Sequence, residues 1–289
     1  MDLILYNPLS KNSKSNVYTH KLIQYYKKNK IPFRIKSILK IDDIRVFLEK
    51  KDHFNNVILL GGDGTINRFV NNIADYDIKQ DIYLKSNGSG NDFLRSLKSN
   101  DQKTQKVMKV KYDTGAETYF VNGVGMGIDG LVTSTVNQAE KKGKFRYMLY
   151  TLKSLMKYIP EPATIIADGK EYKYDKVYLV TLNNGRYFGG GMEITPNADI
   201  TDENLDVIIV HTIKRFFIFM IFFTIYLGLH TKFKKYVTSF KAKKVKVTFT
   251  TPQISQADGE NESDVTSMVA EYSKKDIHLR YYDNKKSAK

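Results

Sequence analysis

The chain has 289 residues, of which 42% are hydrophobic and 27% charged, and this composition excludes fibrous and intrinsically disordered proteins. It contains no cysteine, which excludes disulfide scaffolds, thiolate zinc sites and cysteine nucleophiles. The formal net charge of +15 indicates an anionic partner, and nucleic acid, an anionic membrane surface and a nucleotide polyphosphate all fit it. Because the first residues show no signal peptide, we expect a cytoplasmic protein.

The first third of the chain alternates short apolar segments with amphipathic ones. The run at residues 57–60 is uninterruptedly apolar, as in a strand that is buried on both faces. Hydrophobic periodicity predicts alternating elements, with strands at residues 3–5, 33–39, 57–60 and 82–84 and helices at 17–30, 42–48, 66–73 and 93–97. This alternation indicates a parallel sheet with helices on both faces.

The pattern becomes more β-like after Tyr112. The step Asp168-Gly169 between two extended runs is typical of a hairpin turn. A helical segment is predicted at about 128–158, and strands are predicted at residues 118–121, 163–168, 170–174, 176–182, 205–210, 244–250 and 277–282. We therefore predict an α/β protein with an N-terminal open α/β nucleotide-binding domain, a C-terminal, mostly antiparallel β-sandwich domain and a mobile tail, at residues 1–112, 113–282 and 283–289.

The strongest motif is the glycine-rich segment Gly61-Gly62-Asp63-Gly64-Thr65, which lies between the buried strand and a helix. At the carboxyl end of a parallel strand, glycines let backbone N–H groups approach phosphate oxygens, and the helix N-terminus adds partial positive charge. The alternative is a plain turn in which Asp63 or Thr65 caps the helix. Three glycines around one carboxylate exceed what a cap requires, so the segment favours a phosphate site.

Two further loops follow strands of the same predicted sheet. One contains Gly88, Ser89, Asn91 and Asp92, and the other runs from Asn7 through Ser10 and Lys11. Because loops after parallel strands end at the same edge of a sheet, they can hold one polyphosphate together. Arg95, one turn after Asp92, could face phosphate or solvent. None of these loops matches the Walker pattern, so a P-loop enzyme is excluded.

Five motifs occur in one order along nearly the whole chain, at residues 61–67 (GGDGT-x-N), 88–92 (G-S-G-N-D), 119–125 (Y-F-V-N and a later Gly), 189–206 (GGGM and a later L-D) and 256–260 (Q-A-D-G-E). With them the chain resembles the soluble diacylglycerol kinase and sphingosine kinase superfamily, which has NAD kinases and phosphofructokinases as distant relatives. It departs from the family pattern at Ser89, where the family has threonine, and at Lys11, where glycine is usual.

The resemblance implies transfer of the ATP γ-phosphate to a lipid hydroxyl. Such chemistry needs phosphate-binding amides, Mg²⁺ and a carboxylate that accepts the hydroxyl proton. By motif, Glu260 would be this base, although it could also be a solvated acid in its loop. Asp63 would organise the catalytic metal beside the phosphates, and Asp92 and Asp113 resemble further members of the acidic network. Carboxylates so close together raise one another's pKa unless a cation compensates, which favours Mg²⁺.

The remaining site residues are also carried over by motif. ATP contacts are expected at Asn7, Ser10, Lys11, Ser37, Gly61, Gly62, Asp63, Gly64, Thr65, Asn67, Gly88, Ser89, Asn91 and Arg95. The family's structural Mg²⁺ site would fall on Asp202, flanked by Asp199 and Asn204. Glu203 stands where the family has glycine, which puts the carbonyl geometry of that site in doubt.

Residues 216–229 form an apolar run that is shorter than the roughly 18 to 20 residues needed to cross a bilayer. A buried core helix and an interfacial segment that rests on anionic lipid, between its basic flanks, both fit this run. The cluster of Lys141, Lys142, Lys144 and Arg146 is more typical of a solvated face. Residues 125–130 satisfy G-x-G-x-x-G, but the acidic residue expected about 20 positions later is absent, so a dinucleotide fold is rejected there.

The sequence therefore predicts a lipid kinase that uses ATP and Mg²⁺, with diacylglycerol as the favoured acceptor. We expect it in the cytoplasm, peripherally associated with the inner face of the membrane, with no nucleic-acid partner; a homodimer is left open. A kinase of a soluble substrate, similar to NAD kinase, and a non-catalytic lipid- or nucleic-acid-binding protein remain alternatives.

Overall fold

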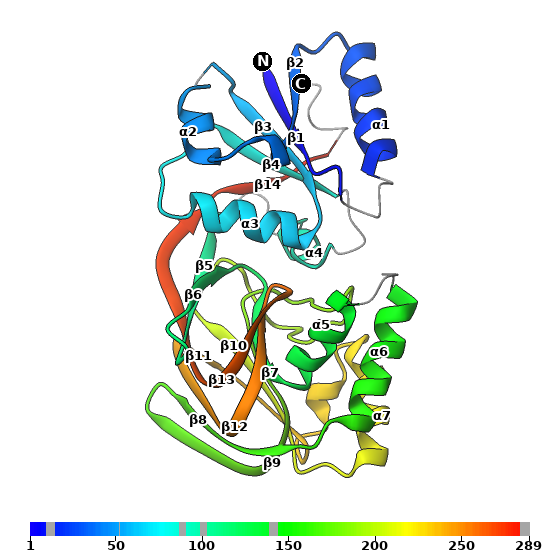
Figure 1. The fold of residues 1–289 in the computed structure, drawn as a ribbon, viewed down its shortest axis with the longest axis vertical. Helices are drawn as coiled ribbons and strands as arrows, with labels where there is room; N and C mark the ends of the chain where they lie inside the picture. Colours follow the sequence, from blue (N-terminus) through cyan, green and yellow to red (C-terminus); the bar gives the residue numbers. More distant parts are fainter. Residues whose placement is uncertain (10–14, 52, 87–90, 99–102, 139–143, 284–289) are drawn as a thin grey trace.

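The computed structural model describes residues 1–9, 15–51, 53–86, 91–98, 103–138 and 144–283, and it divides into two lobes, each built on its own sheet (Figure 1). Both ends of the chain lie in the upper lobe of this view. The predicted combination of an N-terminal α/β domain and a C-terminal antiparallel β-rich domain is confirmed.

The sheet of the first domain has five parallel strands in the order β14-β4-β3-β1-β2, where β1 is Asp2–Tyr6, β2 Phe33–Ser37, β3 Asn56–Gly61, β4 Asp81–Ser86 and β14 Leu279–Tyr281. One face packs against three helices, α2 (Ile44–Glu49), α3 (Asp63–Ile73) and α4 (Asp92–Lys98). The other face packs against α1 (Ser15–Lys28) and Tyr282. Burial from both sides explains why the strands read as continuous apolar runs.

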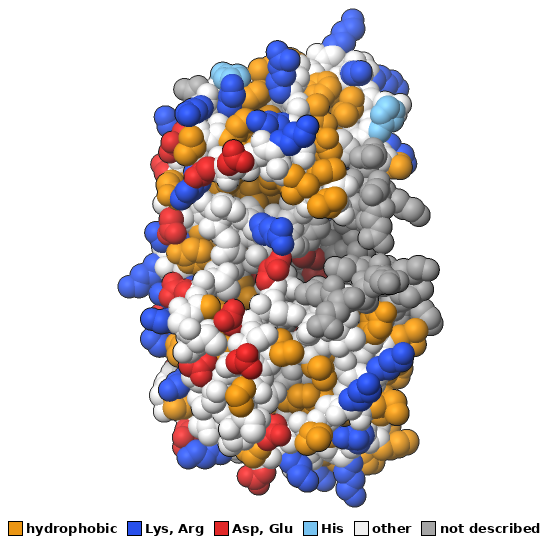
Figure 2. All heavy atoms as spheres, viewed as in Figure 1, with side chains coloured by type: hydrophobic (Ala, Val, Ile, Leu, Met, Phe, Trp, Pro, Cys, Tyr) orange, Lys and Arg blue, Asp and Glu red, His pale blue; other side chains and the backbone are white. Residues whose placement is uncertain are grey.

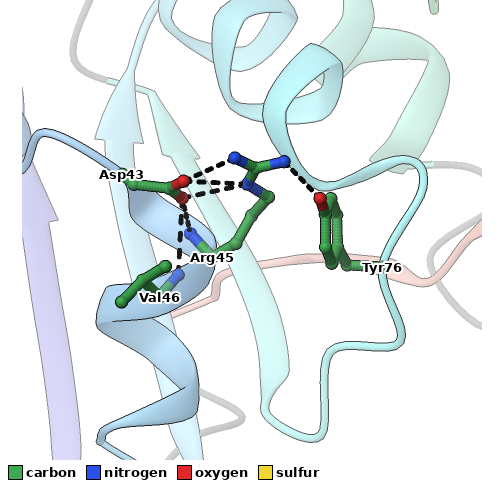
Figure 3. A network of polar contacts seen from close by, with 4 residues as sticks. All are labelled: Asp43, Arg45, Val46 and Tyr76. Carbon is green, nitrogen blue, oxygen red and sulfur yellow. Dashed lines mark hydrogen bonds and ion pairs between the residues drawn. The ribbon is translucent and has the colours of Figure 1, made fainter.

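A polar network holds α2 against the loop that follows α3. The Asp43 carboxylate caps α2 by accepting hydrogen bonds from the amides of Arg45 and Val46 (Figure 3). It also pairs with the guanidinium of Arg45, which in turn donates a hydrogen bond to the hydroxyl of Tyr76. The predicted start of a helix next to Asp42 therefore depends on Asp43 as its N-cap.

The second domain contains nine strands, and all pairings are antiparallel. Both β7 and β8 lie between the long strands β9 and β12, at successive parts of their length, so the sheet curls around one apolar core. The strands are β5 Gln105–Tyr112, β6 Glu117–Phe120, β7 Gly123–Gly127, β8 Glu161–Ala167, β9 Lys170–Asn183, β10 Leu205–His211, β11 Val237–Ala242, β12 Lys244–Ala257 and β13 Glu260–Ile277. Since β7 pairs antiparallel on both sides, rejection of a dinucleotide fold at residues 125–130 is confirmed.

Three helices cover the outside of this domain: α5 (Ile128–Gln138), α6 (Lys144–Lys157) and α7 (Arg215–Ile225). Their buried side chains form a separate apolar core with residues from β9 and β10. In Figure 1 the three helices lie together along one side of the lower lobe.

The two domains exchange strands at their boundary, which differs from the division predicted at residue 112. Strand β5, expected within the first domain, belongs to the second sheet, and β14, expected within the second domain, completes the first. The cause is the length of β13, which spans 18 residues and continues after one residue, His278, into β14. The chain therefore passes between the domains twice, and the side chains of Val107, Val121, Ile200 and Ile277 pack into the core of the first domain.

Because β14 closes the first sheet, its packing should matter for the stability of the whole chain. Leu279 is fully buried in this strand, whereas the neighbouring His278 is exposed. We predict that Leu279→Ala lowers the free energy of unfolding by about 2–4 kcal/mol, because it leaves a cavity in the core. Denaturant titration would measure the loss. His278→Ala should cost less than about 1 kcal/mol, and equal effects of the two substitutions would contradict this account of β14.

Candidate active site

The glycine-rich segment lies where the strand order reverses, between the carboxyl ends of β1 and β3. The amide of Asn7 donates to the carbonyl of Leu60 at 3.3 Å, and its side-chain amide donates to the hydroxyl of Thr65 at 3.0 Å. A Cβ at Gly61 would come within 2.5 Å of the Cβ of Thr65, so the close approach of the loop to α3 requires glycine there. Crevices at such reversal points are where open α/β sheets bind their ligands.

Asp63 is the first residue of α3, and its carboxylate is turned toward the neighbouring helix α4. The backbone amides of Asp92 and Phe93 donate to its two oxygens, each at 3.2 Å. Asp63 therefore binds the N-terminus of α4 and fixes α3 and α4 relative to each other. Its backbone, together with Gly62 and Gly64, forms the start of α3, and a Cβ on Gly64 would meet no atom of the described residues within 4 Å. The start of α3 thus has room for a phosphate group.

Asp92 joins the first domain to the glycine loop, which we define as residues 188–192. It is 4% exposed, and its Oδ2 accepts a hydrogen bond from the amide of Gly190 at 2.7 Å. Gly191 has φ of +119°, a conformation that other residues rarely adopt, and a Cβ there would meet the guanidinium of Arg95 at 2.4 Å. The GGGM motif therefore places a flexible backbone beside the carboxylate of Asp92.

Asp258 forms a second link between the domains. Its carboxylate accepts hydrogen bonds from the amides of Val121, Asn122 and Gly123, at 2.8, 3.0 and 2.9 Å, and from the side-chain amide of Asn67 at 3.0 Å. With Gly259 it forms the two-residue turn between β12 and β13, and both residues have positive φ. Asn67 was predicted to contact nucleotide; the structure instead places its side chain at the domain boundary, between Asp258 and the carbonyl of Tyr119.

The three carboxylates share one electrostatic environment. Burial raises the pKa of Asp63 to about 7, and the negative charge of Asp92 adds to this effect, while the amides of Asp92 and Phe93 oppose it. Burial also raises the pKa of Asp258, although its amide donors counteract part of the shift. A cation near Asp63 and Asp92 would favour their ionised forms, although the described part of the chain contains no group of three or more acidic or histidine side chains that could hold a metal.

Glu260 follows Asp258 at the start of β13 and lies at the surface. The guanidinium of Arg68 on α3 is 3.2 Å from its Oε1, and both side chains are more than half exposed. The structure therefore brings Glu260 to the helix that begins at Asp63, across the domain boundary, and Figure 2 shows acidic side chains beside a hollow at this level of the molecule. This position is compatible with the role of a base that meets a substrate from solvent.

The chain matches two family models that together span both domains. The first, described as diacylglycerol kinase catalytic domain, matches residues 2–119, and the second, described as YegS C-terminal NAD kinase beta sandwich-like domain, matches residues 122–275. The chain belongs to the diacylglycerol kinase-like family of lipid kinases.

Named relatives agree with this assignment. The chain is 30% identical over 206 residues to a diacylglycerol kinase of Mycobacterium tuberculosis, and the match covers 66% of each chain, just under two thirds of the relative. It is 28% identical over 217 residues to "Putative lipid kinase YtlR" of Bacillus subtilis, covering 65% of this chain and 68% of the relative. A crystal structure of a diacylglycerol kinase from Bacillus anthracis has the same fold, with a TM-score of 0.61, 18% identity and coverage of 93% and 92%.

Several residues that were predicted to contact ATP lie at the carboxyl end of the first sheet. Ser37 ends β2 and lines a hollow with Tyr6, Thr19 and Lys36. Asn91 accepts a hydrogen bond from the hydroxyl of Ser86 at 2.6 Å, and the exposed Arg95 lies over the ring of Tyr187 and 3.9 Å from Asp92. Ser10, Lys11, Gly88, Ser89 and the tail from residue 284 lie outside the described residues, as do the side chains of the Lys141 cluster.

The residues predicted to hold the family's structural Mg²⁺ are bound to other groups in the structure, and the metal assignment stays a prediction. The ammonium of Lys241 lies 2.8 Å from Asp202 Oδ2 and 3.3 Å from Asp206 Oδ2. Asp199 accepts hydrogen bonds from the amide and hydroxyl of Thr201. Within the part of the chain that the structure describes, no group of three or more acidic or histidine side chains could hold a metal.

Asp113 was predicted as a further member of the acidic network, but it lies apart from Asp63, Asp92 and Asp258. It is exposed, and its carboxylate accepts hydrogen bonds from the amides of Thr266 and Ser267 at 3.0–3.2 Å. Asp113 therefore ties the turn after β5 to β13 and is not part of the buried acidic group.

Sequence reasoning missed two features of the site. The motif at residues 256–260 contains Asp258, for which the sequence analysis predicted no role. The step Asp258-Gly259 between two extended runs is nevertheless a hairpin signal. Asp129 was treated only as part of a false dinucleotide motif. It is buried beside an apolar cavity, where Gln256 donates a hydrogen bond to its Oδ2 at 2.7 Å, and burial raises its pKa to about 6. No local pattern in the sequence indicates the cavity beside Asp129 or its hydrogen bond with Gln256.

The raised pKa of Asp63 predicts how stability depends on pH. Because the folded protein holds this proton up to about pH 7 and the unfolded chain releases it near pH 3.8, stability is lost as the pH rises through that window. As the pH rises from about 5 to about 8, the free energy of unfolding should decrease in the parent protein. We predict that in Asp63→Asn, without nucleotide or divalent cations, this decrease is smaller by about 2 kcal/mol. Denaturant titrations across this range would test it, and parallel pH profiles would contradict the buried acid.

The Lys241 assignment predicts independence from metal. Removal of divalent cations with EDTA should leave the melting temperature of the nucleotide-free protein unchanged. Lys241→Met should lower the free energy of unfolding by about 1–2 kcal/mol, because Asp206 is largely buried and loses its cation, while partial exposure of Lys241 limits the cost. A parent protein that melts earlier in EDTA would show that a metal is bound after all.

Proposed function

We propose that the protein transfers the γ-phosphate of ATP to a lipid hydroxyl, with diacylglycerol as the acceptor. The observation that carries this proposal is that the glycine loop contacts Asp92 on one side and lines an apolar cavity on the other. The backbone of the glycine loop contacts Asp92, while the side chains of Phe188 and Met192 at its two ends line the cavity. A lipid in the cavity would therefore have its polar end beside the loop that contacts the catalytic carboxylates.

The cavity lies between α5, α6, α7 and the strands β9 and β10, and its volume of about 60 Å³ would have to widen to hold an acyl chain. Its lining is almost wholly aliphatic or aromatic, with Asp129 and Thr151 as polar exceptions. Ligand sites of this kind are mostly apolar with a few polar groups that fix orientation. An acyl chain fits such a lining, whereas a polar acceptor such as NAD would lose its hydration there.

The residues of the chain have distinct parts in the proposed transfer. The start of α3 would bind phosphate through its backbone amides, and Asn7 would fix that loop through Thr65. Asp63 and Asp92 would hold the Mg²⁺ that accompanies ATP, and this ion would neutralise charge on the phosphates. Glu260, held toward α3 by Arg68, would accept the proton of the lipid hydroxyl.

The activity is tested with γ-labelled ATP, Mg²⁺ and a panel of lipids in mixed micelles. We predict label in diacylglycerol, a fall in kcat of at least about 100-fold for Glu260→Gln, and a similar or larger fall for Asp63→Asn. Glu262→Gln is the matched control, because this acid lies two residues away on β13 and is engaged by the hydroxyl of Thr114.

Transfer of label to NAD in place of lipid would overturn the acceptor class. Full activity of Glu260→Gln would remove the proposed base while leaving the lipid acceptor intact. Circular dichroism of each variant would establish that it remains folded.

A further inference from the structure

Helix α7 is apolar on both of its sides. Its inner side chains are buried and line the apolar cavity, namely those of Ile218, Ile221, Phe222 and Ile225. Its outer side chains are exposed, with 74% of Phe216, 55% of Met220 and 52% of Phe223 accessible to solvent. An exposed cluster of large apolar side chains is uncommon in a monomeric protein and indicates a contact surface.

The apolar surface continues beyond α7. Leu227, just after the helix, is 69% exposed, and at the end of α6 the exposed fractions are 61% for Met156 and 70% for Ile159. The guanidinium of Arg215 donates a hydrogen bond to the carbonyl of Tyr158 at 3.2 Å, which holds the two helix ends together. We call this surface the α6–α7 face and define it by Met156, Ile159, Phe216, Met220, Phe223 and Leu227.

The charge around the α6–α7 face is of one sign. Residues 207–257, which include α7, contain no Asp or Glu, and neither do residues 141–160, which include α6. Exposed basic side chains flank the apolar ones, namely Lys153, Lys157, Lys214, Arg215, Lys232, Lys234 and Lys235. Figure 2 shows such blue side chains among orange ones over the part of the surface where Figure 1 places α6 and α7.

We propose that the α6–α7 face docks on an anionic phospholipid bilayer, with the outer aromatic side chains of α7 in the interface and the lysines on the lipid headgroups. Exposed apolar side chains within a ring of basic ones are the two features that interfacial helices combine. A protein partner of ordinary composition would bring basic residues of its own, whereas an anionic bilayer offers negative charge alone. The alternative, that the α6–α7 face binds a second copy of the chain, is tested by gel filtration below.

Helix α7 lies on the membrane and does not cross it. Its 11 residues span roughly 16 Å, about half the thickness of the hydrocarbon layer. Within the described residues, the structure contains no helix with the length and apolar character that a membrane span requires.

The two sides of α7 connect this surface with the proposed chemistry. One side of the helix lines the cavity and the other would lie in the bilayer, so a lipid reaches the cavity by passing along α7. This step rests on the proposed lipid acceptor, whereas docking itself does not require it.

Vesicle flotation tests the docking surface directly. The full chain should float with phosphatidylcholine vesicles that contain about 30% phosphatidylglycerol, and weakly with phosphatidylcholine alone. The variant Phe216→Asp/Phe223→Asp should bind at least about tenfold more weakly, because each substitution removes a large apolar contact. The matched control is Val17→Asp, since Val17 on α1 is 53% exposed, as Phe223 is on α7. This control should float like the parent.

A second measurement does not depend on disruptive variants. Since the chain has no cysteine, Leu227→Cys and Val17→Cys can each carry one environment-sensitive dye. The dye at residue 227 should shift to shorter wavelength with anionic vesicles, and the dye at residue 17 should not. Equal responses, or flotation of the double variant equal to that of the parent, would overturn the proposal.

Two further readouts separate this proposal from its alternatives. Gel filtration that shows a dimeric parent and a monomeric double variant would assign the face to a second copy of the chain and overturn membrane docking. Activity on a short-chain, soluble diacylglycerol should be the same in parent and double variant. If the parent floats as expected but phosphorylates no lipid, the docking surface stands and the proposed function fails.

Discussion

The structure depends on carboxylates that lie at or beside the boundary between its two domains and are held there by backbone amides. Asp63 binds the start of α4, Asp92 accepts a hydrogen bond from the glycine loop, and Asp258 binds three consecutive amides and Asn67. Burial of carboxylates is unfavourable unless donors or cations compensate. These groups therefore fix the relative position of the domains, and they also leave a site at which the charge of a metal–phosphate complex would be favourable.

This arrangement couples three parts of the molecule. The glycine loop contacts Asp92 through its backbone and lines the cavity with its end residues, so the geometry at the phosphate site and the shape of the cavity cannot change independently. Helix α7 forms the outer wall of the same cavity. The large positive charge of the chain is partly concentrated around that helix, where it can attract an anionic surface. The three features together suit the proposed transfer of phosphate to a lipid at the boundary between water and membrane.

Much of the fold could be predicted because local signals and global packing agree. Residues 57–60 read as a doubly buried strand and are one, and the glycine segment after them begins α3 as expected. The strand exchange could not be predicted, since β13 alternates poorly between buried and exposed positions and its continuation into β14 is decided by contacts far away in the sequence. Strand β7 was not predicted from the sequence, and its glycines pack closely between β9 and β12.

For the site, motif order identified the loops and most acidic residues, but it could not say which carboxylates meet. Asp202 pairs with Lys241, from a strand 39 residues away, and no pattern in the sequence indicated this contact. Only the folded register of β10 and β11 brings these groups together. Asp129 likewise gains its importance from a cavity formed by helices that lie far apart in the chain.

The most direct test of the whole account is a crystal structure of the chain bound to MgADP. We expect the diphosphate against the first turn of α3, within hydrogen-bonding distance of the amides of residues 62–65, and the cation beside Asp63 and Asp92. A diphosphate bound elsewhere, or a cation bound away from both carboxylates, would contradict the central claim that the buried acidic boundary is the phosphate-transfer site.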